Sequence, residues 1–484
     1  MKIVMVSSEV VPFAKTGGLG DVLGALPKTL AKLGHEVTVL LPLYRSIDFS
    51  GYNLVANDWE EKVTIDSKNF NLKYSKIKEP KLPLEYIFLE NDSLFDRKAL
   101  YVDPETGADY NDNDDRFIFF NKAVLKFLIS KDYAPDILHV HDWQAALVPV
   151  FTKLCFADHE LFRNCKTVMT IHNLAFQGMY ENSKFGKLGL EEELFYPTSP
   201  FEFYGKVNFI KASITYSDAV TTVSQQYAQE IQTNEFGCGL DGVLKQHADK
   251  LYGILNGVDY SIWSPSRDKK IPFKFIRANL SGKKMNKIEL LNELGLPIRE
   301  KTPLIGIISR LTDQKGFDLL EFIIDDVMKE NLQIVLLGTG DEKYHRFFKD
   351  VESRYPDKCR SLLKFDDTLA HKIEAASDMF LMPSYYEPCG LNQMYSLKYG
   401  TVPIVRKVGG LADTVKDYND QTKEGTGFVF ENYTAQELLS TIKRAIETYQ
   451  NRRNWLKIMK QGMNEDYSWK QSALKYVELY NKLR

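Results

Sequence analysis

Short apolar runs alternate with longer amphipathic segments along both halves of the chain. Such runs are typical of parallel strands that are buried on both faces by helices. The first half contains five expected strands, at Lys2–Ser7, Glu36–Leu41, Ile137–His141, Lys166–Ile171 and Ala219–Val223. The second half contains four, at Leu304–Ser309, Gln333–Leu337, Met379–Met382 and Val402–Val405. The pattern predicts an α/β protein with two doubly wound, Rossmann-like domains that face a cleft.

Chain length supports this division, because 484 residues exceed what one hydrophobic core usually holds. We expect an N-terminal domain at 1–245, a C-terminal domain at 246–464, and a terminal helix within 465–484 that crosses back to the first domain. Near Leu251–Asp259 the apolar periodicity gives way to a polar, Lys-rich stretch that contains proline. This stretch is therefore the expected seam.

Composition excludes several classes of partner. The 62 Lys and Arg residues balance 65 Asp and Glu residues, so the net charge of −3 provides no general attraction to nucleic acid or to an anionic membrane. No apolar stretch reaches the roughly 18 residues needed to span a bilayer, and the first apolar run is too short for a signal peptide. The five scattered cysteines indicate a reducing compartment, either a cytoplasm or a plastid stroma.

A glycine-containing loop follows the first expected strand and reads Lys15-Thr16-Gly17-Gly18-Leu19-Gly20-Asp21-Val22. A glycine pair lets backbone N–H groups approach an anion, a helix start adds positive dipole character, and Lys15 adds a full charge. A dinucleotide-binding turn is disfavoured, since about nine residues separate the strand from Gly17 and the glycine spacing differs. A P-loop sequence is absent. The remaining alternatives are a diphosphate cradle and a glycine turn that serves only tight helix packing.

The K-T-G-G-L sequence of this loop resembles the signature of the glycogen and starch synthases, and the resemblance covers nearly the whole chain. Further motifs match in order, at His139-Val140-His141-Asp142-Trp143, His172-Asn173-Leu174-Ala175-Phe176-Gln177-Gly178, Leu255-Asn256-Gly257-Val258-Asp259, Ser309-Arg310-Leu311-Thr312, Gln314-Lys315-Gly316, Glu387-Pro388-Cys389-Gly390-Leu391 and Gly409-Gly410-Leu411-Ala412-Asp413-Thr414.

This resemblance implies a retaining glycosyltransferase of family 5 with the two-Rossmann-domain GT-B fold. The implied reaction transfers glucose from ADP-glucose to the non-reducing end of an α-1,4-glucan and releases ADP. The implied partners are therefore a nucleotide sugar and an α-glucan, with no cofactor. Closure of the two domains on the donor is expected to exclude water and limit hydrolysis.

Two cations of the second half suit the leaving diphosphate. Breaking the bond to glucose leaves extra negative charge, which a planar guanidinium and an ammonium can stabilise. Arg310 and Lys315 follow the first strand of that half, where loops overhang the cleft. The alternative is a pair of solvated surface charges, and the family resemblance favours the site.

A metal could do this work instead. The run Asp112-Asn113-Asp114-Asp115 is similar to the D-x-D that other glycosyltransferases use to hold a divalent cation. His139 and His141 lie on one side of a strand and could be ligands. The two-domain pattern disfavours a metal at the D-x-D-like run. For the two histidines, a hydrogen-bonding role is the simpler interpretation. We expect no metal.

Polar residues also end two strands of the first half. Asp142 and His172 stand where side chains enter the cleft, and they can hydrogen-bond to sugar hydroxyls. The resemblance implies that both contact the glucosyl unit, and Asn173 supports a polar site there. For His172 the alternative is an ordinary capping or core residue.

Glu387 is the leading carboxylate of the second half. It lies between a buried strand and a helix, so the backbone N–H groups of Cys389, Gly390 and Leu391 can face an anion. Many related retaining transferases carry a second glutamate eight positions later, where this chain has Tyr395. This departure disfavours a glycosidase-like carboxylate pair. We expect Glu387 to bind the donor glucose, with front-face displacement in which the leaving diphosphate deprotonates the acceptor.

The remaining expected contacts come mainly from the resemblance. Phe365 aligns with a family aromatic that stacks on adenine, although it could be a core residue. Gly17, Gly18, Asp21 and Asn256 are also expected to contact substrate. Tyr110 is an exposed aromatic candidate for stacking on acceptor sugars.

Two other functions remain open on the sequence. One is a related GT-B transferase that uses UDP-glucose or another acceptor, such as a sucrose-type synthase. The other is a catalytically silent, glucan-bound partner. Assays of donor choice and of ADP release distinguish them.

Overall fold

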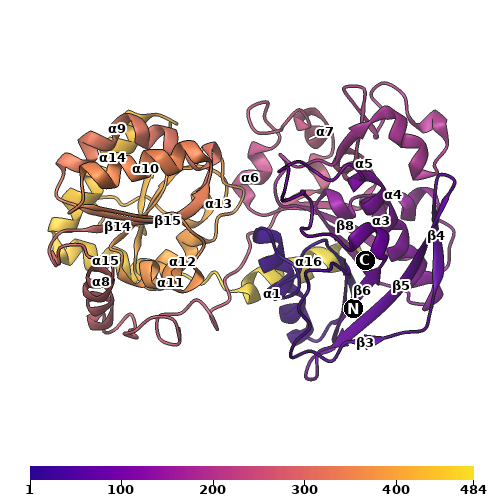
Figure 1. The fold of residues 1–484 in the computed structure, drawn as a ribbon, viewed down its shortest axis with the longest axis horizontal. Coiled ribbons are helices and arrows are strands. Elements are labelled where there is room, and N and C mark those ends of the chain that lie inside the picture. Colours follow the sequence, from indigo (N-terminus) through magenta and orange to yellow (C-terminus); the bar gives the residue numbers. More distant parts are fainter. The chain divides into compact units, whose positions relative to one another are not determined.

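A computed structural model describes all 484 residues and divides them into two compact units (Figure 1). Unit 1 comprises Met1–Val223, Ala228–Ile254 and Trp469–Arg484, and unit 2 comprises Ser224–Tyr227 and Leu255–Ser468. The second segment of unit 1 ends at Ile254, which lies within the expected seam at Leu251–Asp259 and beyond the expected domain boundary at 245/246.

Unit 1 is built on a ten-stranded sheet with the order β13-β12-β8-β7-β1-β2-β6-β5-β3, in which β4 pairs with β5. Its strands are β1 (Lys2–Val6), β2 (Glu36–Pro42), β3 (Val55–Ala56), β4 (Glu61–Ile65), β5 (Lys68–Lys78), β6 (Leu84–Glu90), β7 (Ile137–His141), β8 (Lys166–Ile171), β12 (Ala219–Thr222) and β13 (Leu251–Gly253). From β13 to β6 all pairs are parallel, and β5 joins β6 antiparallel. The carboxyl ends of the parallel strands thus meet at one edge.

The helices of unit 1 are α1 (Gly18–Lys32), α2 (Asp92–Phe95), α3 (Asn113–Ser130), α4 (Leu147–Leu154), α5 (Phe209–Tyr216), α7 (Asp241–Gln246) and α16 (Trp469–Leu483). Helix α6 (Gln225–Glu230) begins among the residues assigned to unit 2. A small antiparallel sheet contains β9 (Met179–Glu181), β10 (Glu202–Phe203) and β11 (Lys206–Asn208). Helix α16 packs against α1, and the Tyr480 hydroxyl lies 2.7 Å from His139 Nδ1, so the carboxyl-terminal helix is part of the unit 1 core.

Unit 2 has a six-stranded parallel sheet with the order β16-β15-β14-β17-β18-β19. Its strands are β14 (Leu304–Leu311), β15 (Gln333–Gly340), β16 (Cys359–Leu362), β17 (Met379–Met382), β18 (Val402–Arg406) and β19 (Phe428–Phe430). Its helices are α8 (Ser281–Glu293), α9 (Phe317–Lys329), α10 (Glu342–Arg354), α11 (Asp367–Ala376), α12 (Asn392–Tyr399), α13 (Gly409–Thr414), α14 (Ala435–Gln450) and α15 (Arg452–Gly462).

Helices cover both faces of the unit 2 sheet, with α9, α10 and α14 on one side and α8, α11 and α12 on the other (Figure 1). The sheet residues alternate between a large core cluster under α9 and α14 and a smaller one under α8 and α11. This confirms the predicted α/β class with doubly wound units.

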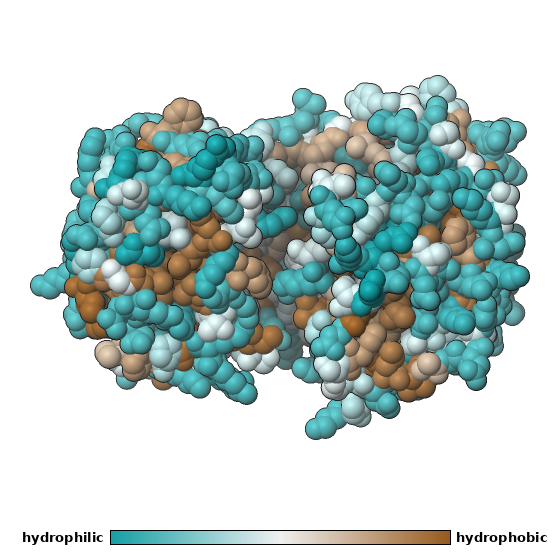
Figure 2. All heavy atoms as spheres, in the orientation of Figure 1, coloured by the Kyte–Doolittle hydropathy of each residue, from teal (hydrophilic) through white to brown (hydrophobic).

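Hydrophilic residues cover most of the face shown in Figure 2, and hydrophobic patches interrupt them on each unit. None of the helices combines the length and the apolar character that crossing a bilayer requires.

Candidate active site

A buried carboxylate holds the glycine loop of unit 1. The two oxygens of Glu9 accept hydrogen bonds from the Thr16 hydroxyl and backbone N–H, both at 2.6 Å, and from the Gly17 N–H at 3.1 Å. The Tyr101 hydroxyl donates to the same carboxylate at 2.9 Å. One of the two glycine N–H groups that we expected to face an anion is therefore already occupied.

The glycine pair itself has no internal packing role. A Cβ atom added at Gly17 or Gly18 would meet no atom within 4 Å, and Gly17 has an extended backbone that any residue adopts (φ −149°, ψ −163°). The tight contacts of this segment lie further on, at Gly20, where an added Cβ would lie 3.2 Å from the Ala14 carbonyl oxygen, and at Gly24, where it would approach the Val11 side chain to 2.9 Å. The packing alternative therefore does not hold for Gly17 and Gly18, which border open space.

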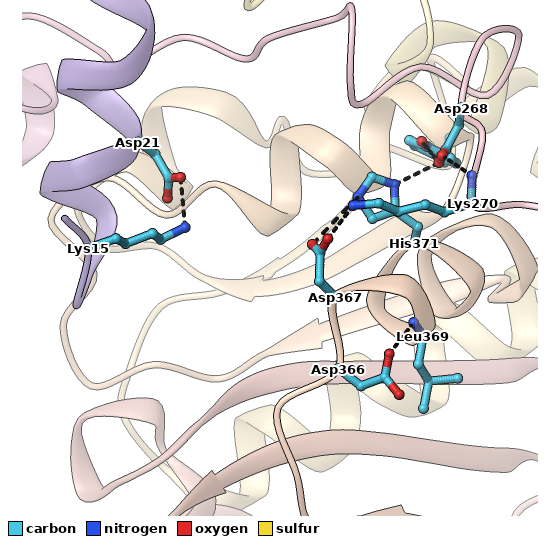
Figure 3. Close-up of polar contacts among 9 residues, drawn as sticks. Lys15, Asp21, Asp268, Lys270, Asp366, Asp367, Leu369 and His371 are labelled. Carbon is cyan, nitrogen blue, oxygen red and sulfur yellow. Dashed lines mark hydrogen bonds and ion pairs between the residues drawn. The ribbon is translucent and has the colours of Figure 1, made fainter. Parts of the chain in front are cut away.

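Lys15 forms an ion pair with Asp21 from the first turn of α1 (Figure 3). The Nζ–Oδ1 distance is 2.7 Å, and the two side chains are 47% and 35% exposed. Exposed ion pairs contribute little to stability. Asp21 therefore neutralises Lys15 in this structure, and a phosphate anion near Lys15 would compete with an accessible carboxylate.

Asp142 follows β7 in a left-handed backbone conformation, with φ 57°. This conformation is strained for a residue with a side chain, and such strain often marks functional positions. The Asp142 carboxylate accepts the backbone N–H groups of His172, at 2.7 Å, and of Asn173. Burial raises the pKa of Asp142 to about 7, and the negative charge of Glu9 adds to the rise.

His172 is an uncharged hydrogen-bonding group in this environment. Burial lowers its pKa to about 3, and its Nε2 lies 3.1 Å from Nδ1 of His141. His139 is also buried, with its ring nitrogens 2.7 Å from the Tyr480 hydroxyl and 2.6 Å from the Thr170 hydroxyl. Both ring nitrogens of His139 are therefore engaged within the core, which leaves it no nitrogen to offer a metal.

The acidic run at the start of α3 is neutralised by cations of its own unit. Asp112 pairs with Arg97 at 2.7 Å, and Lys187 contacts Asp114 and Asp115 at 2.7 and 2.6 Å. These contacts give the D-x-D-like sequence a structural role at the start of α3.

Tyr110 differs from its expected exposed state. The residue is half-buried, and the guanidinium groups of Arg97 and Arg116 lie 5.8 and 5.2 Å from its ring centroid. Cation–π contacts with two arginines account for this placement. The ring is thus less available for stacking on acceptor sugars than the sequence suggests.

Unit 2 contains a cavity of about 190 Å³ at the carboxyl ends of β14 and β17. Its polar and glycine lining includes Ser309, Arg310, Lys315, Ser384, Glu387, Gly390 and Asn392, and its apolar lining includes Ile308, Phe317, Leu381, Met382, Pro383 and Leu391. The structure therefore brings together five of the residues that the sequence analysis selected. They lie where open α/β sheets bind ligands.

Lys315 and Glu387 form an ion pair inside this cavity. The Nζ–Oε2 distance is 2.6 Å, and the Ser384 hydroxyl donates to the same oxygen at 3.1 Å. Gly316, which follows Lys315, has φ 74°, and an added Cβ would lie 2.0 Å from the carbonyl oxygen of Pro383. Glycine is therefore required there to bring the Lys315 turn against the Glu387 loop.

Arg310 is the penultimate residue of β14, has an exposed side chain and lines the cavity. A guanidinium at the mouth of a cavity can bind a diphosphate in bidentate fashion.

The segment after Glu387 turns tightly into α12. Gly390 has φ 68°, and the Gln393 side-chain amide donates to the carbonyl oxygens of Cys389 and Gly390 at 3.0 and 3.1 Å. Burial raises the pKa of Cys389 to about 12, so its thiol is not a nucleophile at neutral pH. Asn256 is buried and donates to the Cys389 sulfur. This contact gives Asn256 a supporting position behind the segment.

Phe365 is not a core residue. It lies in the loop between β16 and α11, and 86% of its surface is exposed. The next residue, Asp366, caps α11 by accepting the Leu369 N–H at 2.9 Å (Figure 3). The loop therefore exposes an aromatic ring to solvent, and the capped first turn of α11 holds the end of this loop.

Tyr395, which replaces the second glutamate of related transferases, belongs to an aromatic stack. Trp263 lies between the rings of His371 and Tyr395, with centroid distances of 3.6 and 4.0 Å. His371 Nδ1 lies 2.7 Å from Asp268, and Lys270 and Asp367 also contact this histidine (Figure 3). Position 395 thus supplies packing and no carboxylate.

Two residues of these sites were not identified from the sequence. Glu9 holds the glycine loop, and Ser384 orients Glu387. A carboxylate between the first strand and the loop is the signal that could have revealed Glu9, because such a buried charge needs several donors.

Two Rossmann-like units, one of them with an Arg, Lys and Glu cavity at its strand ends, define a glycosyltransferase of the two-domain class. The family described as starch synthase catalytic domain matches residues 2–246, and the family described as glycosyl transferases group 1 matches residues 293–461. The chain belongs to the glycogen and starch synthase family.

Similar proteins cover the chain from end to end. It is 46% identical to a glycogen synthase of Pseudothermotoga lettingae, over 100% of this chain and 99% of that one. It is 46% identical to a glycogen synthase of Geotalea daltonii, over 99% and 98%. Among solved structures it is similar to the catalytic domain of starch synthase IV from Arabidopsis thaliana bound to ADP and acarbose, with a TM-score of 0.90, 35% identity and coverage of 100% and 99%.

Proposed function

We propose that this chain transfers glucose from ADP-glucose to the non-reducing end of an α-1,4-glucan, with retention of configuration, and releases ADP. The observation that carries the proposal is the unit 2 cavity, in which Arg310, Lys315 and Glu387 lie together at the strand ends. The family membership and the relative bound to ADP and acarbose support this donor and this acceptor class.

In this reaction the donor diphosphate lies against the cations of the cavity. The bond between glucose C1 and the diphosphate oxygen breaks, and its electron pair stays on the diphosphate. Arg310 and Lys315 stabilise the developing charge. Glu387 holds Lys315 in place and accepts hydrogen bonds from glucose hydroxyls, since its carboxylate has acceptor capacity beyond the lysine and Ser384 contacts.

The acceptor hydroxyl forms the new bond to C1 on the face that the diphosphate leaves, and its proton passes to the leaving diphosphate oxygen. This route needs no covalent glucosyl intermediate on a side chain. Asp142 and the neutral His172 serve as hydrogen-bonding groups for the sugars, which fits the low pKa of the imidazole. Lys15 and the open edge at Gly17 and Gly18 provide a second anion-binding element.

The proposed transfer requires no divalent metal. This part of the proposal is supported by the ion pairs that Asp112, Asp114 and Asp115 form with neighbouring cations. Addition of excess EDTA should leave the initial rate unchanged, and a rate that falls and is restored by Mg²⁺ would show a metal requirement.

We further place the activity in a reducing compartment such as a cytoplasm. The structure contains five free cysteines, of which Cys165, Cys359 and Cys389 are buried. Buried free thiols are usual where disulfides do not form.

The deciding experiment measures nucleotide release and glucan extension with ADP-glucose and with UDP-glucose, using glycogen as acceptor. We expect ADP-glucose to give the higher kcat/KM and a product whose new linkages are α by NMR. Preference for UDP-glucose would assign the chain to a different donor class. Absence of turnover with both donors, together with glycogen binding, would indicate a silent glucan-bound partner.

A further inference from the structure

Unit 2 contains a second hollow, larger than the proposed donor cavity. Its volume is about 1080 Å³, and one helix and two loops form it. Its lining contains six cationic side chains and no acidic one, namely Arg277, Lys423, Arg452, Arg453, Lys457 and Lys460. The rest is mostly amides, Asn451, Asn454, Gln461 and Asn464, with Leu456 as the single apolar residue.

Five of these six cations have no carboxylate partner. Only Lys423 pairs with an acid, Asp420, at 2.7 Å. Elsewhere on this chain exposed lysines and arginines commonly do pair, as Arg354 does with Asp350 and Arg444 with Asp417. The chain has slightly more acids than bases, so a concave surface with positive charge alone is not a consequence of overall composition.

The placement of these charges is unfavourable for the helix that carries most of them. Arg452 and Arg453 stand in the first turn of α15, where the helix dipole is already positive. Arg453 and Lys457 are four residues apart, which sets two like charges on one helix face. The opposite face packs Trp455, Ile458 and Met459 into the core, so the cations cannot turn inward.

Arg277 approaches the same hollow from the loop before α8, and Lys423 from the loop before β19. Cationic side chains from three segments that are distant in sequence therefore line the same hollow. An open hollow of this size can hold a small ligand against its basic wall. Nucleic acids and membranes are usually bound by extended or protruding basic surfaces instead.

We infer that this hollow is a binding site for a small phosphorylated metabolite that carries at least two phosphate charges. Phosphate oxygens would accept charge-assisted hydrogen bonds from the arginines and lysines, and the amide side chains would bind the remaining polar groups. The inference does not rest on the proposed transfer reaction, because none of the hollow's residues belongs to the donor cavity.

The test is calorimetric titration of the full chain with inorganic pyrophosphate and with fructose 1,6-bisphosphate, at constant ionic strength. The first variant is Arg453→Gln/Lys457→Gln. The matched control is Lys470→Gln/Lys475→Gln, which removes two exposed lysines from α16 that line neither the hollow nor the donor cavity. A third variant, Arg310→Gln/Lys315→Gln, identifies any pyrophosphate bound in the donor cavity.

We expect saturable binding of at least one probe that is weakened tenfold or more in Arg453→Gln/Lys457→Gln. The same component should persist in the α16 control and in the donor-cavity variant. Glucosyl transfer without added phosphate compound should be unchanged in Arg453→Gln/Lys457→Gln, which also shows that this variant folds.

Binding of both probes that is equal in wild type and Arg453→Gln/Lys457→Gln would overturn the inference. The inference would also be overturned if the wild-type protein bound neither phosphate probe but bound vesicles with anionic lipid or duplex oligonucleotide, and if Arg453→Gln/Lys457→Gln abolished that binding. Response to pyrophosphate alone would point to a polyphosphate ligand, and response to the bisphosphate alone would point to a sugar phosphate; both results support the site.

Discussion

Lys315 Nζ lies 2.6 Å from Glu387 Oε2 in a pair whose side chains are 17% and 9% exposed. The two residues stand 72 positions apart, on turns that follow different strands of one parallel sheet. The pair therefore joins a proposed phosphate-binding cation to the proposed glucose-binding carboxylate before any donor arrives. A preorganised cation of this kind needs little rearrangement when charge develops on the leaving group.

We expect the pair to be energetically coupled. Lys315→Met and Glu387→Gln should each destabilise the fold by about 3 kcal/mol, because each leaves a buried charge without its partner. The double variant should be destabilised by less than the sum of the two. Chemical denaturation of the three variants measures this coupling.

Activity provides the second half of that test. All three variants should lose at least a hundredfold in kcat/KM, since the double variant restores neutrality but no binding group. The matched control is Lys407→Met, which breaks an exposed pair with Glu431 and should change neither melting temperature nor activity. Strict additivity of the two single changes would contradict the coupling.

The glycine pair should separate function from stability. Gly18→Ala has open space for its new Cβ, so we expect the free energy of unfolding to be unchanged or to rise by up to about 1 kcal/mol. Transfer should nevertheless fall at least tenfold, because the Cβ occupies the open edge that we propose as an anion-binding element. Gly24→Ala should do the reverse and destabilise the fold by about 1–3 kcal/mol through contact with Val11. Unchanged transfer in Gly18→Ala would remove this edge from the site.

Asp142 should make stability depend on pH. Its pKa of about 7 in the fold exceeds its ordinary value of 3.8, so the folded state binds the extra proton between these limits. The stability contributed by this group is present below pH 4 and is lost as the pH rises through about 7. Asp142→Asn removes that loss and keeps an acceptor for the His172 N–H. Its melting temperature should therefore exceed that of wild type by more at pH 8 than at pH 5, and an equal difference at both values would be incompatible with the raised pKa.

The sequence predicted those parts of the fold that follow from continuous apolar runs. Ile137–His141, Lys166–Ile171 and Met379–Met382 are strands with the expected bounds. The expected set omitted β5, which alternates polar and apolar residues and pairs antiparallel with β6. Strand β6 was omitted as well, although Leu84–Glu90 is mostly apolar and pairs parallel with β2. The expected set also omitted the edge strand β19, which has only three residues. Short strands and strands with alternating residues are difficult to predict unless the strands that pair with them are known.

For the site, the motifs identified candidate residues, whereas the side chains that contact these residues are visible only in the three-dimensional structure. The sequence placed Lys315 and Glu387 in one cavity region but gave no indication that they pair. From the sequence, Gly17 and Lys15 were expected to be available for a phosphate. In the structure Glu9 already accepts the Gly17 N–H, and Asp21 already pairs with Lys15. Contacts between residues of distant sequence position depend on side-chain packing, which periodicity does not describe.

Phe365 should contribute to donor binding and to nothing else. Its ring is 86% exposed, so Phe365→Ala should leave the melting temperature unchanged. Loss of a stacking platform for adenine costs about 1–3 kcal/mol, and we therefore expect the KM for ADP-glucose to rise roughly tenfold with a smaller change in kcat. Phe322 on α9 is 82% exposed and lies outside the cavity lining, so Phe322→Ala is the matched control. Initial rates over a range of ADP-glucose concentrations measure both variants. If the two substitutions raise KM equally, the effect belongs to exposed aromatic rings in general and not to base recognition by Phe365.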